Sequence, residues 1–177
     1  MGLRKYLSGI FDSQKFKDHD SKVDGMGVSI AAILTILQTS LVAAPLTWWF
    51  QDPGPVSEEI FSLQLMVKGS QIWEFKAYGA EVIFDPAALT LTGIDLGDLN
   101  ADWTMEGENE IESGRWRFGA IPGTAKPIVG ERSGCITVFH FTKAVGFSGE
   151  TEIRLENAVD DFEVLSPQPL IFNLMIE

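Results

Sequence analysis

Cysteine is almost absent from this 177-residue sequence, and histidine and basic residues are scarce. The single cysteine, Cys135, excludes an intramolecular disulfide and any metal site built from several cysteines. Two histidines, His19 and His140, leave little for acid–base or metal chemistry. Thirteen basic residues against 25 acidic ones give a formal net charge of −12. This balance argues against nucleic acid as a partner, because phosphate neutralisation needs clustered lysine and arginine.

Charged residues are also missing from the stretch between Asp24 and Asp52. Within it, residues 26–44 would form a helix about 28 Å long, close to the hydrocarbon thickness of a bilayer. A helix buried in a soluble core is disfavoured, because so short a chain cannot surround one. Pro45 ends the helix, and Trp48 and Trp49 then fall where an aromatic membrane-interface belt belongs. We therefore expect a transmembrane helix with its aromatic interface over residues 21–50.

Lysine and arginine near this segment set its expected orientation. The next basic residue after it is Lys68, whereas five precede it, namely Arg4, Lys5, Lys15, Lys17 and Lys22. By the positive-inside rule the N-terminus lies in the cytoplasm and the C-terminal part outside, which suits a bacterial inner membrane. A cleaved signal peptide is disfavoured, because Pro45 follows the small residues at 42–44 and the polar region before the helix is long.

Two helical patterns point to contacts at or in the membrane. The pattern of residues 1–20 predicts a cytoplasmic amphipathic helix, whose apolar face is Leu3, Tyr6, Leu7, Ile10 and Phe11. This helix is expected to lie either on the lipid surface or in a groove on a partner protein. One side of the transmembrane helix gathers small and polar residues, namely Gly27, Ala31, Thr35, Gln38 and Val42. Small residues let helices approach and a mid-membrane glutamine favours a hydrogen-bond partner, so we expect this side to meet other membrane subunits. The alternative is that Gln38 simply faces lipid.

Residues 51–56 are expected to form a stiff linker, because they are rich in proline and glycine. The outer domain, residues 57–177, follows and contains 20 acidic and 8 basic residues. Short apolar runs rich in aromatic and β-branched residues alternate there with turns. The expected strands are 60–67, 72–84, 89–94, 103–105, 110–111, 115–120, 135–142, 151–155, 162–165 and 170–176. Strands at this spacing predict an all-β sandwich outside the membrane.

Few residues of this outer domain suggest chemistry. Asp98, Asn100 and Asp102, with Asp95 nearby, have the first spacing of a calcium loop but lack its later glycine and glutamate, so a solvated acidic loop is favoured. Four alternating glutamates, Glu106, Glu108, Glu110 and Glu112, indicate the wet edge of a strand. His140 lies between two phenylalanines and is expected to be a sheet-face residue. We expect no catalytic, cofactor-binding or metal-binding residues, no small-molecule substrate and no enzyme activity.

Two segments carry a family resemblance. Phe84-Asp85-Pro86-Ala87-Ala88-Leu89, after a long strand, is similar to the Y/F-D-P-x-x-L signature of cohesin domains. Residues 134–141, GCITVFHF, resemble a later cohesin strand, with Ile136, Phe139 and Phe141 at its apolar places. The resemblance covers residues 60–176 and implies a jelly-roll sandwich that binds a protein partner through one sheet face. It identifies no binding residues.

Three functions remain open from the sequence. The favoured one is a non-catalytic accessory subunit of a multi-subunit inner-membrane complex, such as a photosynthetic or respiratory assembly. The first alternative, which the resemblance implies, is a membrane-anchored cohesin-type receptor for an extracellular dockerin-like partner. The second alternative is a pilin-like filament subunit. All three take other proteins and the lipid bilayer as partners.

Overall fold

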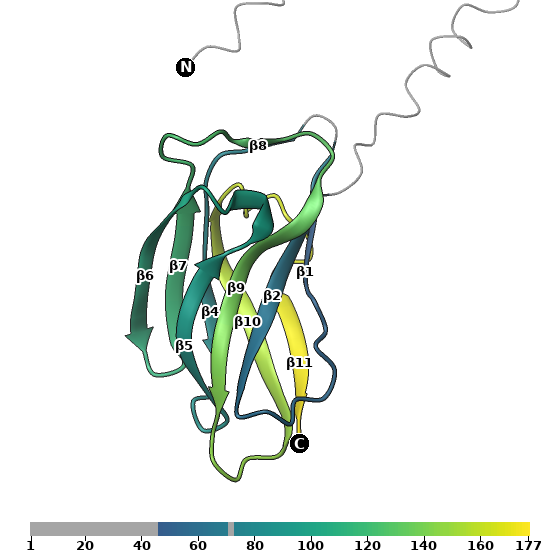
Figure 1. Cartoon of the computed structure of the whole chain (residues 1–177), viewed down its shortest axis with the longest axis vertical. Helices are drawn as coiled ribbons and strands as arrows, with labels where there is room; N and C mark the ends of the chain where they lie inside the picture. Colours follow the sequence, from purple (N-terminus) through teal and green to yellow (C-terminus); the bar gives the residue numbers. More distant parts are fainter. Residues whose placement is uncertain (1–45, 71–72) are drawn as a thin grey trace, which may run out of the picture. The chain divides into compact units, whose positions relative to one another are not determined.

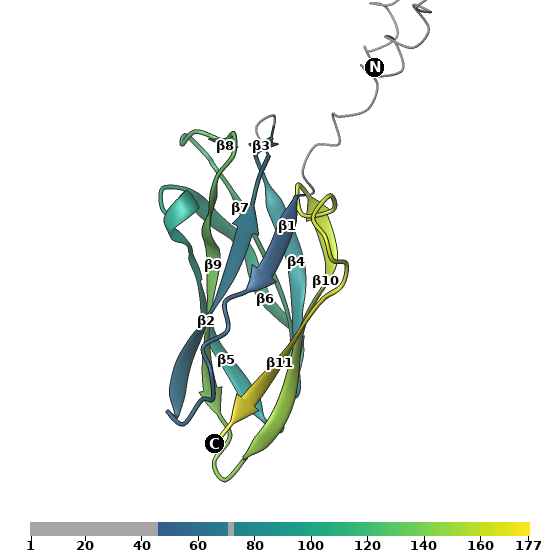
Figure 2. The same cartoon turned by 90° about the vertical axis from the view of Figure 1, so that its right-hand side faces the viewer.

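The computed structural model describes residues 46–70 and 73–177, which form an all-β sandwich. One sheet has four strands in the order β1-β2-β9-β5: Thr47–Phe50, Ile60–Lys68, Ser133–Lys143 and Leu89–Leu96. The other has five in the order β11-β10-β4-β7-β6: Leu170–Ile176, Gly149–Asp160, Tyr78–Phe84, Arg115–Ile121 and Thr104–Glu112. Figures 1 and 2 show the two layers face to face. The expected all-β sandwich is confirmed.

A small third element closes one end of the sandwich. β3 (Glu74–Phe75) pairs with β8 (Ile128–Val129), and a 3-10 turn, η1 (Asp98–Asn100), lies at the same end (Figure 1). Every pair of named strands in the described residues is antiparallel. Within this part of the chain, no helix has the length and apolarity needed to cross a membrane.

Aromatic side chains fill the space between the sheets. The largest fully buried ones are Trp48, Phe75, Phe118, Phe139, Phe141 and Phe162. Tyr78 links the two layers, because its hydroxyl donates to the Ile136 carbonyl 2.9 Å away and accepts from the Asn100 amide at 3.0 Å. Burial of this ring raises the pKa of Tyr78 to about 12. The Tyr78 hydroxyl is therefore a hydrogen-bonded polar group that joins the two sheets within the apolar core.

The sandwich begins earlier than the expected boundary at residue 57. Trp48 is 1% exposed and packs edge-on against Phe162, with ring centroids 5.0 Å apart. Its expected place in an aromatic membrane belt is therefore wrong, because alternation along β1 turns it into the core. Trp49, one residue on, faces outward and is partly exposed. Its membrane contact stays a prediction.

The expected linker also belongs to the sandwich. The Val56 side chain is buried, its N–H donates to the Met175 carbonyl, and its carbonyl accepts from Glu177. The segment 51–56 is therefore fixed to the sandwich at both ends, by Gln51, whose N–H donates to the Gln64 carbonyl, and by Val56 beside β11. Expectations for the amphipathic helix, the transmembrane helix and the face from Gly27 to Val42 lie outside the described residues.

Several expected strands differ from the structure, and 103–105 and 110–111 belong to one continuous strand, β6. Residues 162–165 form a turn, in which the Leu165 N–H donates to the Phe162 carbonyl and both side chains point into the core. The expected strand 72–84 is interrupted, because the Asp161 carboxylate accepts the N–H groups of Lys76 and Ala77. These donors are thereby removed from the sheet ladder.

Candidate functional site

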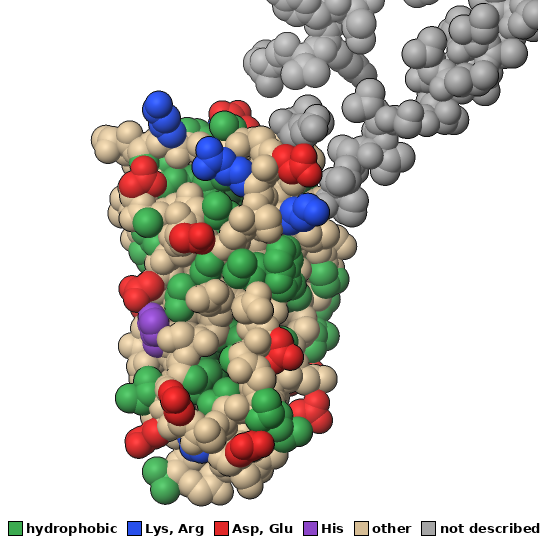
Figure 3. All heavy atoms as spheres, turned by 45° about the vertical axis from the view of Figure 1, so that its right-hand side comes forward, with side chains coloured by type: hydrophobic (Ala, Val, Ile, Leu, Met, Phe, Trp, Pro, Cys, Tyr) green, Lys and Arg blue, Asp and Glu red, His purple; other side chains and the backbone are tan. Residues whose placement is uncertain are grey.

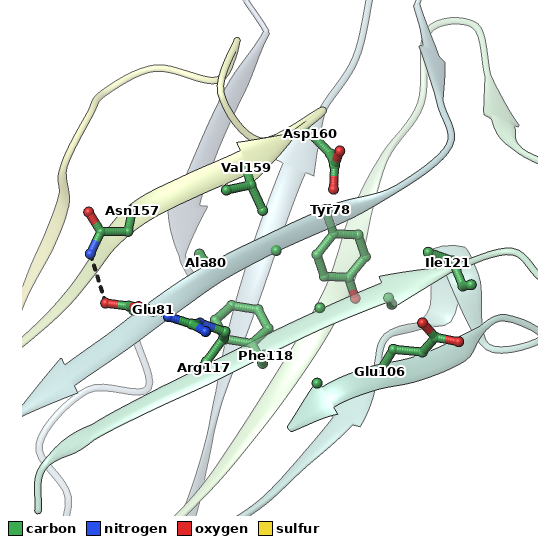
Figure 4. Close-up of a pocket in the computed structure, with 14 residues that line it drawn as sticks. Tyr78, Ala80, Glu81, Glu106, Arg117, Phe118, Ile121, Asn157, Val159 and Asp160 are labelled. Carbon is green, nitrogen blue, oxygen red and sulfur yellow. Dashed lines mark hydrogen bonds and ion pairs between the residues drawn. The ribbon is translucent and has the colours of Figure 1, made fainter. Parts of the chain in front are cut away.

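Two glycines face each other at the centre of the five-stranded sheet. Gly79 on β4 pairs with Gly119 on β7, and the row continues to Val159 on β10 and Glu106 on β6. Neither central residue has a side chain to cover the outer face, so the sheet is hollowed there. The hollow measures about 670 Å³ and is drawn in Figure 4.

The floor of this hollow is bare backbone that has no room for larger residues. A Cβ placed on Gly119 would lie 2.8 Å from the Tyr78 carbonyl oxygen, and one on Gly79 would lie 2.9 Å from a Val159 methyl. Real Cβ atoms do not approach backbone oxygens so closely. Packing between β4 and β7 therefore requires glycine, and the hollow is a consequence of it.

Irregularities border the hollow on both sides. The register of β10 shifts between Glu156 and Val159, and Asn157 and Asp160 there have positive φ angles of 50° and 55°. The register of β6 shifts just after Glu106. Bulges of this kind change the direction in which side chains point. Residues other than glycine that adopt the left-handed backbone conformation are found often at functional sites. Two bulged strands flanking a glycine floor mark this face as the candidate site.

A buried carboxylate forms one wall of the hollow. Glu81 is 5% exposed and accepts hydrogen bonds from Arg115 Nε at 2.8 Å, Arg117 Nη2 at 2.8 Å and Asn157 Nδ2 at 2.7 Å. Burial by itself raises the pKa of Glu81, but the hydrogen bonds from Arg117, Asn157 and Arg115 outweigh it and the pKa falls to about 2. Two guanidinium groups and one amide thus satisfy the buried carboxylate at this wall.

The remaining rim is acidic and aliphatic. Glu106 and Asp160 stand on the two flanking strands, exposed to solvent, and Val159 and Ile121 also line the hollow (Figure 4). Among the described residues, neither carboxylate has an ion-pair partner. The hollow therefore offers uncompensated negative charge beside an apolar surface.

The opposite sheet brings together three residues that the sequence does not connect. Ser62 Oγ lies 2.8 Å from His140 Nδ1, and His140 Nε2 lies 2.9 Å from Asp95 Oδ2, across β2, β9 and β5. The side chain of Asp95 is 75% exposed and that of His140 is 34% exposed, and Figure 3 shows this histidine, in purple, on the outer surface. A serine-hydrolase site needs an enclosed oxyanion position, which a flat sheet face does not provide. His140 is a sheet-face residue, as expected.

The other candidates from the sequence have structural roles. Asn100 is fully buried, and its side chain bonds to Tyr78 and to the Gly97 N–H, so it turns away from Asp98 and Asp102. Within the described part of the chain, no group of three or more histidine, cysteine or acidic residues could hold a metal ion. The four glutamates lie along β6, the exposed edge strand of its sheet, as the alternation predicts.

Known structures share this fold. No protein-family model and no curated protein matches the sequence. A cohesin module from a Clostridium perfringens family 33 glycoside hydrolase has a TM-score of 0.60 at 14% identity, over 75% of this chain and 97% of that one. A non-cellulosomal cohesin from Archaeoglobus fulgidus has a TM-score of 0.57 at 9% identity, over 76% and 92%. The cohesin of a Clostridium thermocellum OlpA–dockerin complex has a TM-score of 0.60 at 11% identity, over 76% and 100%. The described residues therefore form a cohesin-like β-sandwich.

Proposed function

We propose that this chain is a non-catalytic, cohesin-type receptor that binds a dockerin-like protein partner on the outer face of its five-stranded sheet. The observation that carries the proposal is the glycine-floored hollow between the bulged strands β10 and β6. A hollow whose floor is formed by two paired strands is already in place before a partner binds, and this favours it as a docking surface. Solved cohesins of the same fold include modules in complex with dockerins.

We further propose that the N-terminal segment tethers this receptor to a bacterial inner membrane, with the sandwich outside. Residues 26–44 are long and apolar enough to span a bilayer, and the basic residues lie on their N-terminal side. The tether is short, because the sandwich starts at Thr47. The accessory-subunit and filament functions would use the same segment for lateral contacts, and they differ from the receptor in not needing the hollow.

The test blocks the hollow without disturbing the core. Val159 is 47% exposed on the rim, so Val159→Trp adds bulk over the glycine floor at a position where solvent now lies. Ile171→Trp is the matched control, since Ile171 is 51% exposed on β11 of the same sheet and does not line the hollow. Tagged full-length chains would be cross-linked to their neighbours in the native host and purified in mild detergent.

Mass spectrometry of the purified material distinguishes the functions. The receptor predicts a dockerin-like extracellular protein that is recovered with the wild type and with Ile171→Trp but lost with Val159→Trp. Membrane subunits recovered equally with all three chains would overturn the proposal and favour the accessory subunit. Self-cross-linked ladders, again equal in all three, would favour the filament.

A further inference from the structure

We propose that the outer face of the four-stranded sheet pairs with the same face of a second copy of this chain, so that the hollow of each copy stays open. This face consists of the side chains that point outward from β1, β2, β9 and β5. The inference goes beyond the proposed function and rests on it in one respect, the membrane attachment that holds two copies close together.

Charge is nearly absent from this face. Along β2 its side chains are, from residue 60 to residue 66, isoleucine, serine, glutamine and methionine. Beside them on β9 are valine, histidine and threonine at positions 138, 140 and 142. Among the outward side chains of these four described strands, the acidic and basic ones are Asp95 on the edge strand β5 and Lys68 at the end of β2.

The outer face of the five-stranded sheet has the opposite character. Acidic and basic side chains project from it on three strands, as shown by Glu106 on β6, Arg117 on β7 and Glu152 on β10. Loss of charge together with aromatic residues and methionine is the compositional sign of the centre of a protein interface. The four-stranded sheet shows both, since Trp49 on β1 is paired in register with Met66 on β2 and both are partly exposed.

Polar groups at the centre of this face are already hydrogen-bonded within the sheet. His140 uses both ring nitrogens, with Nδ1 2.8 Å from Ser62 Oγ and Nε2 2.9 Å from Asp95 Oδ2. Thr92 Oγ1 donates to the His140 carbonyl at 3.0 Å. Covering a polar group costs free energy when its hydrogen bonds to water are lost without replacement. These groups keep their partners when they are covered, so another protein can cover this face at a lower cost.

The charge of the chain favours a second copy as the occupant. Residues 57–177 hold 20 acidic and 8 basic residues, so two copies repel each other wherever both present carboxylates. On the four-stranded face this repulsion is smallest. Its two charged side chains, Lys68 and Asp95, have opposite signs, and a two-fold contact can bring the lysine of one copy to the aspartate of the other. A basic partner would instead be attracted to the acidic surfaces elsewhere.

The size of the face sets the strength of the contact. Four strands are about 19 Å wide by ordinary strand spacing, and seven residues of a strand are about 24 Å long, which gives about 450 Å² per copy. Two copies together would cover about 900 Å², less than the 1,200–2,000 Å² or so of stable complexes. We therefore expect a weak contact for free chains, strengthened when two copies are attached to one membrane.

Pairing through this face has a consequence for the receptor. The hollow lies on the outer face of the other sheet, so the two hollows of a pair point away from each other. A pair can then bind two partners, or one partner that carries two docking segments.

The first experiment locates the contact by cross-linking full-length chains in phosphatidylethanolamine–phosphatidylglycerol vesicles. Gln64→Cys places a thiol at the centre of the face, and Asn173→Cys is the matched control, on an exposed outward position of β11 in the other sheet. The native Cys135 is buried, and the wild type measures its background. With a short bismaleimide we expect about fivefold or more covalent dimer from Gln64→Cys than from Asn173→Cys at equal chain density. Equal yields would overturn the inference.

The second experiment adds one negative charge without a change of size. Gln64→Glu puts carboxylates on both copies at the contact and should weaken association by about tenfold or more, whereas Asn173→Asp should leave it unchanged. Energy transfer between donor-labelled and acceptor-labelled full-length chains in the same vesicles measures association. If Gln64→Glu associates as well as the wild type, the chains meet through another surface and the inference is wrong.

Other occupants give a different result in the native host. If Gln64→Cys is cross-linked there to another protein and forms no dimer, the face belongs to that protein and a second copy is refuted.

The two proposals fail differently. Val159→Trp alters the other sheet and should dimerise as the wild type does. Dimers that form while the captured neighbours are unaffected by Val159→Trp refute the receptor and leave the pairing intact. A partner that is lost with Val159→Trp, in a chain that gives no Gln64→Cys dimer, refutes the pairing alone.

Discussion

Glu81 makes the free energy of unfolding of the sandwich depend on pH in the acid range. Because its folded pKa of about 2 lies below the ordinary 4.5, its stabilising effect is complete above pH 4.5 and is lost as pH falls toward 2. Glu81→Gln should lower the free energy of unfolding at pH 7 by about 2 kcal/mol, less than for a fully buried ion pair because Arg117 is largely exposed. Between pH 4.5 and 2, the free energy of unfolding of the variant should fall less steeply than that of the wild type. Denaturant unfolding across this range measures both effects.

The control for Glu81 is Glu112→Gln, which removes an exposed carboxylate 3.4 Å from Arg115. It should change stability by less than about 0.5 kcal/mol and leave the acid slope intact. An unchanged slope in Glu81→Gln would show that other carboxylates govern acid unfolding.

Tyr78 gives the matching prediction at alkaline pH. Its folded pKa of about 12 exceeds the ordinary 10, so the unfolded chain releases this proton first and stability falls as pH rises from 10 toward 12. Tyr78→Phe should remove this decline. At pH 7 it should cost about 1–3 kcal/mol, because the buried Asn100 amide loses its acceptor and the Ile136 carbonyl keeps only the Gly97 N–H as a donor. Thermal unfolding at several pH values measures both, and a variant as stable as the wild type at pH 7 would contradict the buried hydrogen bonds.

At the scale of elements, strand β1 places two adjacent tryptophans on opposite faces, with Trp48 in the core and Trp49 facing outward. Trp48→Ala should destabilise the sandwich by about 3–5 kcal/mol, since it removes a ring that is 1% exposed and packed on Phe162. Trp49→Ala removes an outward, partly exposed ring and should cost clearly less. Denaturant midpoints of the two variants test this order. Equal losses would contradict the orientation of β1.

The strands illustrate what local sequence can predict. Runs such as 60–67, 115–120 and 170–176 were identifiable from apolar and β-branched residues between turns, and the structure has strands at all three. β1 was not identifiable, because its four residues follow directly on a long apolar run and their alternation is too short to stand out. β8 has two residues and depends on its pairing with β3, which no local pattern reveals.

At the scale of the whole molecule, the candidate site depends on register and could not be predicted. Gly79 and Gly119 are 40 positions apart, and each alone would suggest only a turn or a weak strand. Their juxtaposition requires the pairing of β4 with β7, and the bulges that frame them require β10 and β6 in place. The same holds for Ser62, His140 and Asp95, which come from three different strands. Sequence reasoning could identify the sandwich, but not the face of it that carries the hollow.

The division between tether and sandwich leads to the last prediction. Every residue that lines the hollow lies between Tyr78 and Asp160, so a chain beginning at Leu46 should fold and bind the captured partner within about threefold of the full-length affinity. A chain beginning at residue 57 lacks Trp48, Phe50 and Val56, and the loss of these buried side chains should unfold it. Calorimetric binding and thermal unfolding of both chains test this. If the chain from Leu46 folds but binds more than about tenfold weaker, then the first 45 residues take part in recognition. That outcome would favour an accessory subunit held by its membrane segment over a receptor that binds through its sandwich.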